Sequence, residues 1–322
     1  AAAFLVKNHS SSWMKVGYYG DILVVAIDSN KEKFIERCLN SVLEQSFTKF
    51  EIIIVNDGSI DKSENKVLLF DDPRIRYFSN SNMGVSFSRN LGISKARFDW
   101  ICFLDADDFW NFNHLETLFN GINEFPKAKM LTTATLIFQN QKLTESSDTY
   151  PYDFRGYISE YFKYASQSTI FNSSSVCINR NVFISGFYFN ENLNKGEDLD
   201  LWFRIIMHYS VAYIKSYTVI YDMSDSSSSN KSFVSIDKHV LSIIGNYYKN
   251  DLSFLDNYIQ YFVRRNLLHY YYFDKNVIKK FTNIKFLDGA EFYWKILYNR
   301  HLYLVLSFSY FIYKKLIHTL RK

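Results

Sequence analysis

One stretch of this chain joins an apolar run directly to a cluster of acids. Residues 100–104 read Trp-Ile-Cys-Phe-Leu, and Asp105, Ala106, Asp107 and Asp108 follow at once. An uninterrupted apolar run of this length is typical of a strand buried on both faces of a parallel sheet. The acids then lie at the carboxyl end of the strand, the edge where open α/β sheets bind ligands. They either hold a divalent cation that contacts phosphate or form a solvent-exposed acidic turn.

The composition allows a large folded core and excludes some classes of protein. The chain has 322 residues, of which 48% are hydrophobic, enough for one large domain or two smaller ones. Cys38, Cys102 and Cys177 have no metal-type or redox-type spacing, so we expect reduced core residues of a cytosolic protein. The first twenty residues lack a signal-peptide pattern, and the longest apolar run, 303–313, is shorter than the roughly 20 residues of a spanning helix. We therefore expect no transmembrane segment.

Strands and helices alternate in the first third of the chain. Apolar runs predict strands over residues 21–27, 50–55, 74–78 and 99–104. Amphipathic spacing predicts helices between them, over residues 31–45, 62–70 and 85–96. This order is that of a doubly wound, mostly parallel α/β sheet, whose crossovers are right-handed. The carboxyl ends of its strands would bring Asp28, Asp57, Asp105 and Asp107 to one edge.

Two groups beside this edge have a functional and a structural interpretation. Asp57, followed by Gly58, either accepts a hydrogen bond from a nucleotide base or ribose or only forms a turn. Arg89 either donates its planar guanidinium to a base carbonyl or phosphate or is a surface charge.

Beyond residue 128 the pattern becomes mixed. Alternation predicts a strand over residues 130–138, and further segments predict a helix over 155–164, a strand over 174–179 and a helix over 197–206. Glu197 and Asp198 occupy the first turn of that last helix. Acids at this position also stabilise the helix dipole, so they have a structural interpretation as well.

The polar residues 224–230 predict a boundary, and the part beyond it is basic and aromatic. Residues 231–322 contain 15 Lys and Arg against 6 Asp and Glu, whereas the rest of the chain contains 22 against 27. Helices expected over 233–248, 252–273 and 291–318 either lie on an anionic membrane surface or cap the catalytic body or another subunit.

Six segments taken together resemble the family-2 glycosyltransferases of the GT-A fold, over a region from Ile22 to about Ser229. They occur in the family's order, at residues 27–30, 38–47, 54–59, 82–93, 103–108 and 196–202. The resemblance implies a GT-A catalytic domain over 21–229, with a nucleotide-sugar half (about 21–110) and an acceptor half (about 111–229). A lead-in (1–20) would precede it, and a helical C-terminal extension (230–322) would follow.

The resemblance also implies which residues bind the donor. Its nucleotide would be bound by Ile27, Asp28, Ser29, Asp57, Gly84, Arg89, Asp105 and Ala106. Asp107, together with Asp105, would bind Mn²⁺ or Mg²⁺. In this family a His often follows the acceptor half, but residues 221–225 contain none, so diphosphate oxygens and water would complete the coordination. The first turn also departs from the family's usual Pro-Thr-Tyr-Asn, since it reads Ile-Asp-Ser-Asn at residues 27–30.

By the same resemblance, the reaction is an inverting transfer with Asp198 as the base that deprotonates the acceptor and Glu197 beside it. The donor would be a UDP-sugar, and the acceptor a glycan or lipid-linked glycan of bacterial lipopolysaccharide or capsule synthesis. The setting would be the cytoplasm or the inner face of the plasma membrane. No nucleic-acid partner is expected, and an oligomer stays open.

Two other functions remain as alternatives. A haloacid-dehalogenase-type phosphohydrolase also uses Asp-x-Asp after an apolar strand, but that motif would fall here on the fourth strand. The other alternative is an inactive sugar-binding assembly subunit.

Overall fold

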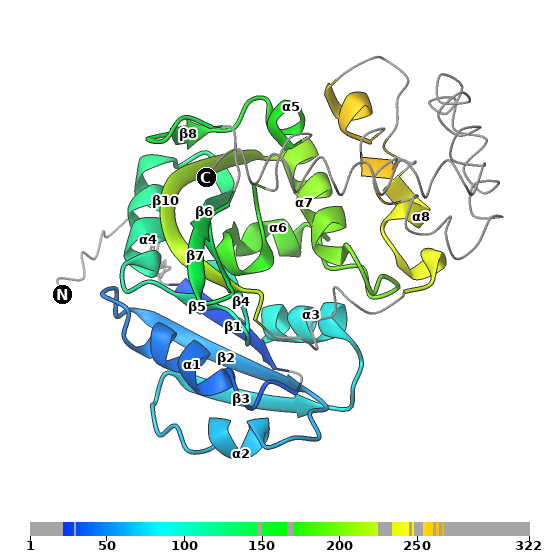
Figure 1. Ribbon diagram of the computed structural model, residues 1–322. Helices are drawn as coiled ribbons and strands as arrows, with labels where there is room; N and C mark the ends of the chain where they lie inside the picture. The colour runs from blue at the N-terminus through cyan, green and yellow to red at the C-terminus, as the bar shows by residue number, and fades with distance from the viewer. Residues whose placement is uncertain are drawn as a thin grey trace, which may run out of the picture. The chain divides into compact units, whose positions relative to one another are not determined.

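The computed structural model describes residues 22–28, 30–146, 150–165, 170–224, 234–244, 247, 254–259, 262–263 and 266, with only the backbone for 23–28. The chain divides into two compact units, residues 1–244 and 245–322. The first unit contains the labelled elements of Figure 1. In the second unit, residues 254–259 are helical, and most of the expected C-terminal helices lie outside the described residues. The role of that region and its expected boundary at 224–230 therefore stay predictions.

Four parallel strands form the first half of the sheet. They are β1 (Ile22–Asp28), β2 (Phe50–Asp57), β3 (Ile75–Asn80) and β4 (Trp100–Asp105), in the order β3-β2-β1-β4. Helices α1 (Ile35–Leu43), α2 (Ser63–Val67) and α3 (Val85–Lys95) follow the first three strands in turn. Each strand and helix predicted for this part of the chain is present, with small differences at the ends. The parallel arrangement brings the carboxyl ends of all four strands to one edge.

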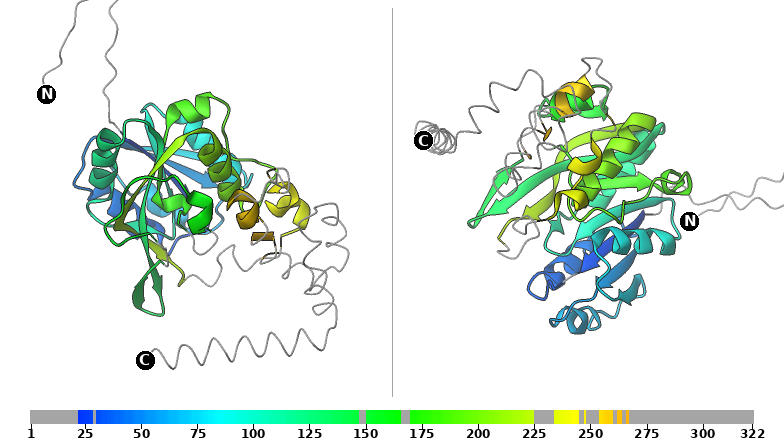
Figure 2. Two further views of the ribbon diagram at one scale, coloured as in Figure 1. Left: turned by 90° about the horizontal axis from the view of Figure 1, so that it is seen from above. Right: turned by 90° about the vertical axis from the view of Figure 1, so that its right-hand side faces the viewer.

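The second half of the sheet is mixed. Strand β9 (Val176–Asn179) pairs antiparallel with β4 and with β6 (Ala128–Gln139), and β6 pairs parallel with β10 (Ser210–Asp222). Shorter strands extend the sheet, namely β5 (Phe109–Trp110), β7 (Lys142–Glu145) and β8 (Arg155–Tyr157). Among the described residues, ten strands form this one sheet. The β6–β7 hairpin projects from it, as both views of Figure 2 show, and all the residues of β7 are exposed.

The helices of the second half include α4 (His114–Glu124), α6 (Arg180–Ile184) and α7 (Glu197–His208). Among the described residues, the short elements include α5 (Tyr161–Ala165), α8 (Leu241–Ile244) and the 3-10 turns η1 (Ser173–Ser175) and η3 (Ile236–Lys238). The helix expected over 155–164 is wrong in its first part, because residues 155–157 pair with β10 as strand β8. Pairing with a strand edge overrides the weak helical pattern there.

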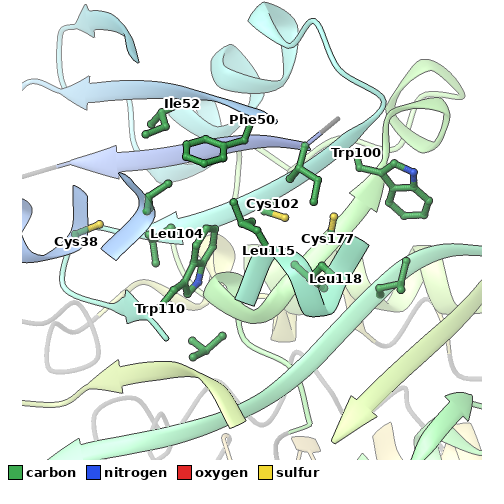
Figure 3. Close-up of a cluster of buried hydrophobic side chains, with 14 of the residues drawn as sticks. Cys38, Phe50, Ile52, Trp100, Cys102, Leu104, Trp110, Leu115, Leu118 and Cys177 are labelled. Carbon is green, nitrogen blue, oxygen red and sulfur yellow. The ribbon is translucent and has the colours of Figure 1, made fainter. Parts of the chain in front are cut away.

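A hydrophobic cluster of the described residues joins the two halves of the sheet. Figure 3 shows Cys38 of α1 and Leu104 of β4 in the same cluster as Leu115 of α4 and Cys177 of β9. Helix α1 contributes the apolar face that its spacing predicted, with Ile35, Cys38, Leu39 and Val42 all buried. The three cysteines are free and buried, which confirms that they are reduced core residues. Within the described segments, no helix has the length and apolar character needed to cross a bilayer.

Candidate functional site

The carboxyl ends of β1, β2 and β4 bring together most of the predicted donor-binding residues. Ile27 at the end of β1 lies opposite Asp105 of β4, and Asp28 lies opposite Asn56 of β2. Ser29, which follows, is outside the described residues. The pairing of β1 with β4 therefore places the start of the predicted first turn next to Asp105, where the Asp-x-Asp turn begins.

Asp108 fixes the conformation of the Asp-x-Asp turn, residues 105–108. Asp108 is buried, and its carboxylate accepts hydrogen bonds from Ser174 Oγ at 2.5 Å and from the backbone N–H of Asp222 at 3.0 Å. Ser174 Oγ also accepts the backbone N–H of Asp105 at 3.2 Å. Burial, and then the charges of Asp105 and Asp107, raise the pKa of Asp108 well above its usual value. Asp108 therefore shapes the turn, while Ala106 packs in the core.

Asp107 lies between two cationic side chains. Its Oδ2 is 2.8 Å from Lys31 Nζ, and its backbone carbonyl accepts a hydrogen bond from Arg37 Nη2 at 2.7 Å. Arg37 Nη2 is also 2.7 Å from Asp222 Oδ2 at the end of β10. Burial, followed by the charge of Asp105, raises the pKa of Asp107, and Lys31 opposes this shift. The turn is thus connected to both halves of the sheet.

Arg89 joins the Asp-x-Asp turn to the predicted catalytic acids. Its side chain is only 4% exposed, and its Nη2 and Nη1 atoms lie 2.9 Å from Asp105 Oδ1 and 2.9 Å from Glu197 Oε1. Burial lowers the pKa of Arg89, but the carboxylates of Asp105 and Glu197 outweigh this and raise it, so the group stays charged. The structure pairs this guanidinium with two carboxylates, and the predicted contact with a nucleotide base stays a prediction.

Glu197 and Asp198 begin helix α7, as the sequence predicts. Gly196 precedes them with φ +76°, and the side chain of Glu197 is buried against Arg89. Burial, and then the charge of Glu197, raise the pKa of Asp198 to about 7, while Arg89 lowers it. At physiological pH, a carboxyl group with a pKa near 7 is partly deprotonated and can accept a proton, as a general base must.

Asp57 organises the loop that carries Gly84. Its Oδ1 accepts hydrogen bonds from Met83 N at 2.8 Å and Asn80 Nδ2 at 2.9 Å, and its Oδ2 accepts one from Gly84 N at 3.0 Å. Asp57 is buried, so these bonds replace water. The structure brings Asp57 and Gly84 together and shows that Asp57 holds the loop over residues 80–84, while a contact with nucleotide stays a prediction.

Gly58 is required next to Asp57, and we expect Gly58→Ala to destabilise the protein. Its φ is +70°, and an added Cβ would lie 2.6 Å from the backbone N of Asn82. Strain of this kind costs about 1–3 kcal/mol in the free energy of unfolding, measured by urea denaturation. Gly156→Ala is the matched control, since a Cβ there would meet only a Phe154 ring atom at 3.7 Å. Equal stability of the two variants would contradict the prediction.

The residues fit a divalent cation only if its coordination is completed by other ligands. Among the described residues, no three His, Cys, Asp or Glu side chains gather where they could hold a metal. The negative charge of Asp105 acts on Asp107, because it contributes to the raised pKa of Asp107. Mg²⁺ is often held by one or two carboxylates together with substrate phosphates and water. The pair Asp105 and Asp107 fits this type of site.

Sequence reasoning missed four residues of this site, namely Lys31, Arg37, Ser174 and Asp222. Lys31 and Arg37 contact Asp107 of the Asp-x-Asp turn, and Asp222 pairs with Arg37. Lys31 directly follows the first turn, and this position next to a predicted anionic site was the one available signal. The others lie on separate elements and have no motif of their own.

Comparisons with known proteins agree on the family. The family described as Glycosyl transferase family 2 matches residues 22–191. The glycosyltransferase GlyA of Streptococcus pneumoniae is 35% identical over 106 residues, which are 32% of this chain and 15% of GlyA. An uncharacterised glycosyltransferase of Rickettsia bellii is 33% identical over 177 residues, 55% of this chain and 25% of that protein. The chain therefore spans a quarter or less of the length of these two relatives.

Solved structures of similar fold include the Staphylococcus aureus protein TarS. Residues 1–349 of TarS in complex with UDP-GlcNAc give a TM-score of 0.64 at 18% identity, over 76% of this chain and 73% of TarS. The complex with UDP gives 0.58 at 19% identity, over 79% and 73%. With the strand order described above, this likeness confirms the expected α/β fold of the GT-A type.

The family match ends before Glu197 and Asp198, but it contains the first turn, Asp57, Arg89 and the Asp-x-Asp turn. It covers more than half of the chain and starts at the first residue of β1. On this match, the chain belongs to glycosyltransferase family 2.

Proposed function

We propose that this chain transfers a sugar from a UDP-sugar to a hydroxyl of a glycan or lipid-linked glycan, with inversion, in the synthesis of a bacterial surface polysaccharide. The contact that carries the proposal is the buried bridge from Asp105 through Arg89 to Glu197. It joins the acids expected to face the donor diphosphate to the start of the helix that holds Asp198. The donor diphosphate and the acceptor hydroxyl would therefore meet beside the carboxyl ends of the strands.

Two further observations support this proposal. TarS, which shares the fold, has been solved with UDP-GlcNAc, which is a UDP-sugar, and with UDP, which is the nucleotide part of such a donor. Asp198 has a pKa of about 7, raised first by burial, so it can take up a proton near neutral pH.

The proposed reaction needs no covalent intermediate. The acceptor hydroxyl gives its proton to Asp198 while its oxygen forms a bond to the anomeric carbon. The bond from that carbon to the diphosphate oxygen breaks, and UDP leaves with the bonding electrons. Attack opposite the leaving group inverts the anomeric configuration. A bound Mn²⁺ or Mg²⁺, held by Asp107 with Asp105, would supply positive charge for the departing diphosphate.

We expect Asp107→Ala to remove the dependence of UDP binding on Mn²⁺. Calorimetric titration of the wild-type protein with UDP should show weaker binding when EDTA replaces Mn²⁺. In the variant the affinity with Mn²⁺ should fall by roughly tenfold or more, because the site loses a carboxylate ligand. The exposed Asp153→Ala serves as the matched control and should behave as wild type. Unchanged Mn²⁺-dependent binding in Asp107→Ala would contradict the site assignment.

A further inference from the structure

The side chain of Lys31 lies where a cation bound to Asp107 would act. Its Nζ is 2.8 Å from Asp107 Oδ2, and the two side chains are only 17% and 19% exposed. The carboxylate proposed to bind a divalent cation is therefore already neutralised by a positive charge of the chain itself.

The backbone of Lys31 is fixed, so only its side chain can leave Asp107. The backbone N–H of Lys31 donates to Ser63 Oγ at 3.0 Å, and that of Glu32 donates to Asp61 Oδ2 at 3.0 Å. These bonds attach the segment before helix α1 to the first residue of α2 and to the loop that precedes it. The four-carbon stem of a lysine is flexible, and its ammonium can move to another anion without any change in the backbone.

The other two cations at the site are poorly suited to such a movement. Arg89 is buried and bonded to both Asp105 and Glu197, so its departure would leave the buried carboxylate of Glu197 and the partly exposed carboxylate of Asp105 without a partner. Arg37 binds the backbone carbonyl of Asp107 and the carboxylate of Asp222. The Asp107 carboxylate is paired instead with Lys31. Lys31 is the cation in direct competition with a metal ion at Asp107 Oδ2.

We propose that Lys31 is an exchangeable counter-ion of Asp107 that weakens divalent-cation binding until the diphosphate of the donor arrives. This inference rests on the proposed function, because it requires a diphosphate donor. A divalent ion on Asp107 would repel the ammonium at close range, so both cannot bind the same oxygen. The diphosphate offers the ammonium a new anionic partner, and Asp107 then becomes available. Nucleotide and cation consequently strengthen each other's binding.

The test measures Mn²⁺ binding without nucleotide, from the loss of the electron paramagnetic resonance signal of free Mn²⁺. Lys31→Met should bind Mn²⁺ roughly tenfold tighter than wild type or more, because a unit charge about 4 Å away has a strong effect in a partly buried site. Lys31→Arg keeps the charge and should stay as weak as wild type. Lys33→Met, an exposed lysine two residues away, is the matched control and should also equal wild type. Thermal melting of each variant checks that it is folded.

The same titration with UDP present distinguishes the inference from the proposed function. Addition of UDP should raise the Mn²⁺ affinity of wild type more than that of Lys31→Met. If Lys31→Met and wild type bind Mn²⁺ equally without UDP, while UDP still promotes Mn²⁺ binding in both, the role of Lys31 is refuted and the proposed function stands. If neither UDP nor Mn²⁺ binds to any of the folded variants, the proposed function is refuted along with it.

Discussion

Asp198→Asn is expected to lower kcat for sugar transfer by about 10²–10⁴-fold, the usual contribution of a general base. The amide cannot accept the proton of the acceptor hydroxyl, but it keeps the size and shape of the carboxyl group. The affinity for UDP should be unchanged, because the acids expected to face the donor are Asp105 and Asp107. Transfer is measured from UDP release, and UDP binding by calorimetry. Glu191→Gln, an exposed acid on the preceding loop, is the control.

The pH dependence gives this prediction a second measurement. A base acts in its deprotonated form, so kcat/KM of the wild type should rise with pH and level off above about 7, the pKa of Asp198. In the folded protein this pKa lies above its unfolded value of 3.8, so the stability contributed by protonation is lost as pH rises through 7. Asp198→Asn removes the buried negative charge that forms above pH 7, so the variant should be at least as stable as wild type at pH 8. Residual turnover close to wild type would show that another group is the base.

Arg89→Met is expected to reduce the free energy of unfolding by about 3–5 kcal/mol, the effect of removing one partner from a buried ion pair. The guanidinium is 4% exposed and pairs with both Asp105 and Glu197, and its loss would leave the carboxylate of Glu197 buried without a counter-ion. Urea denaturation at pH 7 measures the loss. Arg155→Met is the matched control, because Arg155 pairs with Glu124 at the surface and such a pair contributes about 1 kcal/mol or less.

A double variant separates the charge effect from the loss of packing. Adding Glu197→Gln to Arg89→Met removes one of the two unpaired carboxylates, so the double variant should be more stable than the sum of the single effects predicts. Additive effects would mean that Arg89 stabilises the protein by packing alone. A loss in Arg89→Met no larger than in Arg155→Met would contradict the buried bridge itself.

The order of the elements in the first half of the sheet could be predicted because its signals are local. Apolar runs and helical spacing identified β1 to β4 and the helices between them, and Asp-Gly and Asn-Met-Gly segments marked the turns. The signals were weaker in the second half. Residues 155–157 form a strand because β10 offers them a partner, which their own sequence does not reveal.

The candidate acids were also identified from sequence, but their partners were decided by the tertiary structure. Lys31 and Asp107 are 76 residues apart, Arg89 and Glu197 are 108 residues apart, and Ser174 and Asp108 are 66 residues apart. Hydrophobic periodicity depends on neighbouring residues and therefore appears in the sequence. An ion pair depends on which segments the sheet brings side by side, and it leaves no periodic pattern. The sequence by itself thus determined the strands and helices near the donor edge and the acids on it, whereas only the fold decided that Arg89 bridges two acids and that Lys31 neutralises Asp107.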